Sequence, residues 1–130
     1  MVIPVTDEEN IWDMYDSSEE QRSIKGPYMI VDTSTSKRFQ IAMDEKVEWV
    51  KYEFGGEFSV KRHISKPSYD KHYVDISDSP PSHEPLEKGV KLSVYCDPAG
   101  FMEIEGCGGS PKKLVPGTEM KVNITTEFCL

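Results

Sequence analysis

Hydrophobic and polar residues alternate along much of this chain, with the period of two that is typical of β-strands. Five stretches carry the pattern or a short apolar run: YMIVDT at 28–33, KRFQIAMD at 37–44, KVEWVKYEF at 46–54, EFSVKRHI at 57–64 and GVKLSVYC at 89–96. Gly55 and Gly56 separate the third stretch from the fourth and predict a hairpin. Trp49 is expected in the core.

The C-terminal part continues the alternation. The stretch FMEIE at 101–105 predicts a strand with Phe101, Glu103 and Glu105 on one face. Met102 and Ile104 lie on the opposite face. A last strand is predicted within 120–128, after a turn at Pro116-Gly117.

Two other segments lack this regularity. Residues 1–26 are predicted to be an irregular N-terminal segment, in which Thr6 and Glu9 have the spacing of a helix cap and predict a short helical turn around 7–15. Residues 65–88 contain four of the nine prolines and predict a long surface loop with one short strand, HYVDI.

Together these elements predict an all-β fold. Many short strands separated by turn signals are typical of an antiparallel β-sandwich, here of about seven to nine strands with a short helical turn near the N-terminus. At 130 residues, the chain is most simply a single domain, 1–130, with enough residues to bury a core.

The order GFMEIEG, then LVPGTEM, then TTEFCL resembles the C-terminal part of the galactose mutarotase-like superfamily, the β-supersandwich of aldose epimerases and related carbohydrate-active proteins. The resemblance covers roughly Pro27 to Leu130. It implies a partial supersandwich, because a complete member is about twice as long. In the hexose-phosphate branch, the catalytic glutamate precedes the Leu-x-Pro-Gly turn, and Glu105 matches that position. The family's acid histidine has no matching position in this chain.

The candidate site residues follow from this resemblance and from residue chemistry. Glu105 is the candidate catalytic base, since anomer interconversion needs a carboxylate to remove a proton and an acid to return one. Glu103 shares its face and is a candidate ligand-binding residue. A polar and aromatic cluster suits sugar recognition and supplies the other candidates, Arg62, His63, Tyr69 and His72. The two glutamates could equally be a solvated strand face, and the cluster a polar loop.

Composition excludes some partners. A formal net charge of −8 argues against nucleic acid or an anionic membrane as the main partner. No apolar run approaches the roughly 20 residues of a membrane helix. The start, MVIPVTDEEN, lacks a signal-peptide pattern, so we expect a cytoplasmic protein unless such a segment has been removed.

Three widely spaced cysteines suggest reduced thiols, and we expect neither a metal site nor a cofactor.

Three functions remain open at this stage. The first is a carbohydrate-binding domain that holds a sugar or sugar phosphate without turnover. The second is a structural or protein-interaction module of the same fold. The third is an aldose or hexose-phosphate epimerase, with Glu105 as base and His63 or His72 as acid. Because half a supersandwich leaves apolar faces or edges uncovered, a homodimer is also expected.

Overall fold

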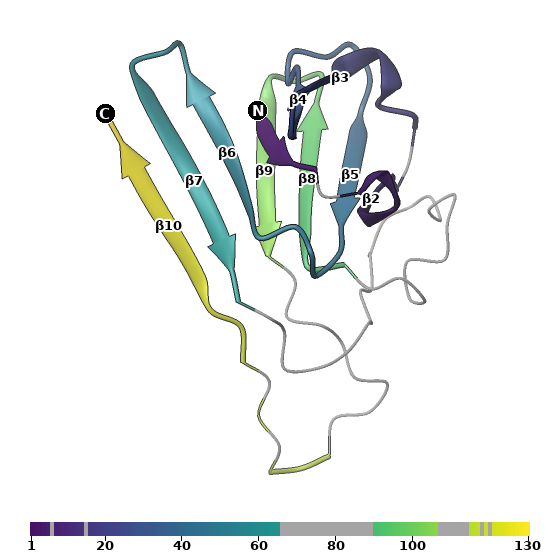
Figure 1. Cartoon of the computed structure of the whole chain (residues 1–130). Coiled ribbons are helices and arrows are strands. Elements are labelled where there is room, and N and C mark those ends of the chain that lie inside the picture. The colour runs from purple at the N-terminus through teal and green to yellow at the C-terminus, as the bar shows by residue number, and fades with distance from the viewer. Residues whose placement is uncertain (6, 15, 66–89, 107–114, 118, 120) are drawn as a thin grey trace.

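A computed structural model describes residues 1–5, 7–14, 16–65, 90–106, 115–117, 119 and 121–130. These residues form two antiparallel sheets that pack as a β-sandwich (Figure 1). The predicted fold class is therefore confirmed.

The described part contains ten strands and two short 3-10 helices. In chain order they are β1 (Val2–Pro4), η1 (Glu8–Asn10), β2 (Ile11–Asp13), η2 (Glu19–Gln21), β3 (Arg22–Lys25), β4 (Tyr28–Val31), β5 (Phe39–Met43), β6 (Trp49–Phe54), β7 (Phe58–Ile64), β8 (Leu92–Asp97), β9 (Phe101–Gly106) and β10 (Ile124–Cys129). Within the described residues, neither helical segment is long and apolar enough to cross a membrane.

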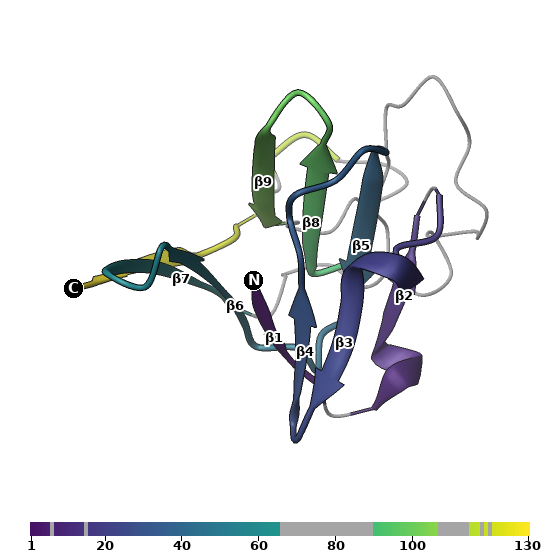
Figure 2. The ribbon, with the colours of Figure 1, turned by 90° about the horizontal axis from the view of Figure 1, so that it is seen from above.

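The two sheets differ in width. One has the strand order β10-β7-β6-β1-β4-β3, and the other has the order β2-β5-β8-β9. In Figure 2, β1, β4 and β3 lie beside the four-stranded sheet, whereas β7 and β10 extend away from it. We call β6, β7 and β10 the wing, and the wing's inner face is the one that carries Val50 and Ile64.

The core lies between the sheets and follows the alternation in β5 and β8. Phe39, Ile41 and Met43 of β5 pair with Cys96, Val94 and Leu92 of β8, and all six side chains are buried. From the wider sheet, buried side chains pack into the same cluster, namely those of Ile3, Met29, Val31, Val50 and Ile64. Burial of alternate apolar residues from both sheets thus holds the sandwich together.

The opposite face of the four-stranded sheet also contains buried side chains. A second cluster there consists of Trp12, Met14, Ala42 and Val90. Every residue of β5 is consequently buried, on both faces of the strand.

The prediction of an irregular N-terminal segment at 1–26 was wrong, because residues in that range form β1, β2 and β3. Each of these strands has only three or four residues. Such lengths are too short to display a period of two, and pairing with distant strands decides their conformation: β1 lies between β4 and β6, and β2 pairs with β5.

Other local predictions had mixed outcomes. The expected helical turn is η1, a 3-10 helix shorter than the predicted range. The glycine hairpin is confirmed, with Gly55 and Gly56 at φ values of 59° and 86° that favour glycine. Trp49 was wrongly expected in the core. It lies half-buried on the wing's outer face, with Lys61 Nζ 4.4 Å from its ring centroid. Of the predicted loop at 65–88, only Ser65 lies within the described residues.

Two phenylalanines offer a matched test of the core. Phe39 is 1% exposed and Phe54, near the tip of the wing, is 47% exposed. We expect Phe39→Ala to lower the free energy of unfolding by about 3–5 kcal/mol, because it opens a cavity between the sheets. Phe54→Ala should cost at most about 1.5 kcal/mol, since that side chain is half exposed and packs against the rings of Tyr52 and Phe58. Urea unfolding of both variants measures the difference, and equal losses would contradict this core.

The cysteines offer a test of solvent access. Cys96 is buried in the core, and burial raises the pKa of its thiol to about 11, whereas Cys129 is exposed. Because the thiolate is the reactive species, Cys96 should stay unmodified at pH 8 in the folded protein. In a Cys107→Ser background, a chromogenic thiol reagent should react with one thiol quickly and with the second only after urea is added. Rapid reaction of both thiols without urea would contradict the placement of Cys96.

Candidate functional site

A cavity of about 380 Å³ lies between β9 and the inner face of the wing. We call it the β9 cavity. Its lining residues come from three strands and are Tyr52, Phe54, Val60, Arg62, Met102, Glu103, Ile104 and Glu105. The cavity brings together three residues that the sequence singled out, Arg62, Glu103 and Glu105, although more than 40 positions separate the first from the others.

Arg62 reaches the cavity from the middle of β7. Its side chain lies on the inner face, opposite Val50 of β6 and Thr126 of β10 in the register of the wing. Its Nη1 donates a hydrogen bond of 2.5 Å to the carbonyl oxygen of Ile104, on β9. Since β9 is the outer strand of the four-stranded sheet, this bond links the wing to the edge of the other sheet.

Two aromatic rings form the apolar side of the cavity. Tyr52 and Phe54 follow Val50 along the inner face of β6, and their rings meet edge to face with 4.5 Å between centroids. Sequence reasoning did not assign either ring to a site. The signal was available in principle, because a hairpin closed at Gly55-Gly56 pairs Tyr52 with Val60 and so places it on the face of Arg62.

Glu105 has a defined set of partners on β8 and β5. Its Oε2 accepts hydrogen bonds from Ser93 Oγ at 2.6 Å and from Gln40 Nε2 at 2.8 Å. Gln40 is 4% exposed and Ser93 is fully buried. The carboxylate therefore satisfies two polar groups on the face of the sheet that points away from the core, and this accounts for a glutamate at position 105 in structural terms.

Glu103 is exposed and lies opposite Tyr95 in the register of β8 and β9. The Tyr95 hydroxyl donates a 2.6 Å hydrogen bond to Asp97 Oδ2. Desolvation and this bond raise the pKa of Tyr95, so it is a neutral hydroxyl beside the two glutamate positions at ordinary pH. Glu103 thus lines the β9 cavity and is exposed, with its side chain on the face of β9 opposite the buried Ile104.

The structure does not bring His63 to this cavity. His63 lies on the outer face of β7, where its Nε2 is 3.2 Å from Glu127 Oε1, and it lines a different cavity with Lys91 and Glu48. Alternation along β7 requires this, since Arg62 and His63 are neighbours in one strand. Tyr69 and His72, the other candidate ligand-binding residues, lie outside the described residues.

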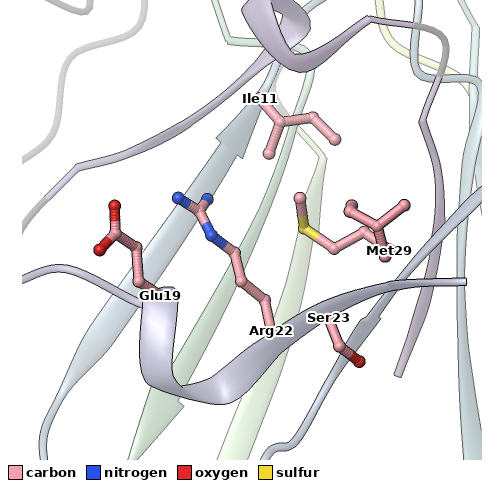
Figure 3. A pocket seen from close by; sticks show the side chains of 6 residues that line it. Ile11, Glu19, Arg22, Ser23 and Met29 are labelled. Carbon is pink, nitrogen blue, oxygen red and sulfur yellow. The ribbon is translucent and has the colours of Figure 1, made fainter.

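Sequence reasoning also missed a cavity of about 340 Å³ beside β3, lined by Ile11, Glu19, Arg22, Ser23, Ile24 and Met29. Figure 3 shows that Arg22, Ile11 and Met29 extend toward a common space, with Glu19 beside it. Arg22 Nη2 lies 3.8 Å from Asp13 Oδ2, and Asp13 also accepts hydrogen bonds from the backbone and hydroxyl of Ser18. These polar groups satisfy one another, so the β9 cavity is the stronger candidate.

Groups that could bind a metal do not gather in the described part of the chain. No cluster there contains three or more histidine, cysteine, aspartate or glutamate side chains in an arrangement that could hold a metal ion.

Comparisons of the chain with protein-family models, with curated proteins and with solved structures found no match. The resemblance to the mutarotase-like superfamily therefore remains a prediction from the C-terminal residues.

The different surroundings of Glu103 and Glu105 can be tested by measuring how an alanine at each position changes the free energy of unfolding. Glu105→Ala removes the acceptor of Ser93 Oγ and one of the two acceptors of Gln40 Nε2, and leaving the buried Ser93 hydroxyl without an acceptor should cost about 1–3 kcal/mol. Glu103→Ala, on the same face but exposed, should change the free energy of unfolding by no more than about 0.5 kcal/mol. Urea unfolding of both variants measures the two changes in the free energy of unfolding. A loss at Glu103 as large as that at Glu105 would contradict the described network.

Proposed function

We propose that this chain is a carbohydrate-binding domain and that the sugar occupies the β9 cavity. One observation carries the proposal: a single open cavity is lined by two aromatic residues, an arginine and two glutamates. Sugar rings have apolar faces that pack on aromatic rings and hydroxyl groups that exchange hydrogen bonds with charged side chains. The cavity volume is near the lower end of the range for small-molecule sites, about 300–1,000 Å³.

The roles of the residues follow from their positions. Tyr52 and Phe54 provide the stacking surface, and Glu103 accepts hydrogen bonds from sugar hydroxyls at the exposed rim. Arg62 holds the wing next to β9 through Ile104 and directs its remaining donors toward the ligand. Glu105 has its Oε2 bound to Ser93 and Gln40, so its main part is to fix the cavity wall.

The charged residues that line the cavity indicate which class of sugar it should bind. The residues that line the cavity include two glutamates and one arginine. Because an anionic ligand would meet a net negative charge, we expect neutral hexoses or short oligosaccharides to bind better than hexose phosphates or uronic acids.

The proposal stops at binding without turnover. An epimerase needs an acid near the base, and the candidate acid His63 lies on the outer face of β7, away from Glu105. The other two histidines lie outside the described residues. A protein-interaction module is the second candidate, and the exposed apolar side chains at the tip and edge of the wing favour it.

A ligand-detected NMR screen of neutral hexoses, hexose phosphates and uronic acids tests the proposal. We expect a neutral sugar to bind and Tyr52→Ala to weaken it at least about fivefold, since an aromatic contact contributes roughly 1 kcal/mol. Tyr28→Ala is the matched control, because Tyr28 is a partly exposed tyrosine of the same sheet that packs against Trp49 on the outer face.

Far-UV circular dichroism of both tyrosine variants verifies that each is folded. If no sugar binds, or if Tyr28→Ala reduces binding as much as Tyr52→Ala, the proposed site is wrong.

A further inference from the structure

The outermost strand of the wing, β10, has an edge without a partner strand in the described residues (Figure 1). Its other edge pairs with β7 along six residues. The N–H of Ser65 donates to the carbonyl oxygen of Asn123, which fixes the direction of the backbone groups. Because these groups alternate along a strand, the N–H and C=O of Ile124, Thr126 and Phe128 face the open edge.

The same three residues carry side chains on the inner face of the wing. Ile124 is 48% exposed and Phe128 is 70% exposed. The Phe128 ring stacks on Phe58 with 6.0 Å between centroids, and Phe58 contacts Phe54, so a row of rings reaches the open edge. A row of this kind beside unpaired backbone groups is a template for strand addition, which natural proteins usually block with charges, prolines or bulges.

We propose that a second copy of this chain covers the edge. The two β10 strands pair antiparallel about a twofold axis that passes through Thr126, with Thr126 opposite the partner's Thr126. In this register Ile124 lies opposite the partner's Phe128, and the pairs at 124, 126 and 128 form about six backbone hydrogen bonds. The two six-stranded sheets then form one continuous sheet, and the apolar rows of their inner faces meet.

The charge on β10 excludes the register that is shifted toward the C-terminus. Glu127 is the only ionisable carboxylate in the strand, and its side chain lies on the outer face. With the axis at Thr126, Glu127 lies opposite the partner's Thr125, which is neutral. Moving the axis by one residue, to Glu127, would place two carboxylates directly opposite each other, which is unfavourable. A twofold axis that passes between two residues is also excluded, because side chains alternate along the strand. Such an axis would place inner-face residues of one copy opposite outer-face residues of the other.

This dimer is independent of the sugar site. The β9 cavity is lined by residues of β6, β7 and β9, whereas the backbone pairing of the dimer is made by β10. Loss of sugar binding would leave the dimer unaffected, and loss of the dimer would leave the cavity lining in place.

Sedimentation velocity of the full chain over a range of concentrations tests the assembly. We expect a species of about twice the chain mass of 14.8 kDa. Thr126→Pro removes an N–H that faces the open edge while the bonds to β7 remain, so it should raise the dissociation constant at least about tenfold. Thr126→Val is the matched control, because it retains the N–H, and it should remain dimeric.

Disulfide trapping tests the register. In a Cys107→Ser, Cys129→Ser background, Thr126→Cys should form a covalent dimer on mild oxidation, because opposed Cα atoms in such a pair are about 5.5 Å apart. Glu127→Cys should not, since it lies diagonal to its symmetry mate at about 7–8 Å. A monomer at every concentration for the wild type, or trapping at 127 and not at 126, would overturn the proposal.

Discussion

The packing of β5 and β8 against β1 and β4 is the interaction on which the rest of the structure depends. Alternate apolar side chains of the two central strands meet those of the wider sheet, and the cluster they form is almost fully excluded from water. The hydrophobic effect contributes most where such side chains are removed completely. This core fixes the position of β9, which pairs with β8, and of β6, which pairs with β1.

The wing is a consequence of one sheet being wider than the other. Along the inner face of β7, Ile64 lies in the core, Arg62 lies at the border and Phe58 lies near the tip. A single face thus passes from a dry interior to solvent within seven residues. Arg62 suits the border position, because its long apolar stem covers neighbouring side chains while its guanidinium reaches the edge of β9. Both proposed surfaces, the cavity and the open edge, belong to this inner face.

Glu105 illustrates how one residue can have two explanations. Its place in the sequence matches a catalytic position in the superfamily that the chain resembles. Its surroundings give it a structural part, since Ser93 and Gln40 are buried and both donate to it. A carboxylate oxygen that already accepts two hydrogen bonds is held in place, but it is less able to take up a proton. The surroundings of Glu105 therefore favour a structural role in the cavity wall over the role of a catalytic base. The exposed Glu103 is the freer of the two groups.

The sequence by itself determined the all-β class and the separate faces of Arg62 and His63, because both follow from a period of two within a strand. The two glycines determined the hairpin at Gly55-Gly56. The sequence also placed Glu103 and Glu105 on one face of β9. Only the tertiary structure decided that Tyr52, Arg62 and Glu105 border one cavity, and that residues 1–26 contribute β1, β2 and β3. These features depend on pairing and packing between residues distant in the chain. Local alternation contains no information about which strands become neighbours, and three-residue strands are stable only once those neighbours are present.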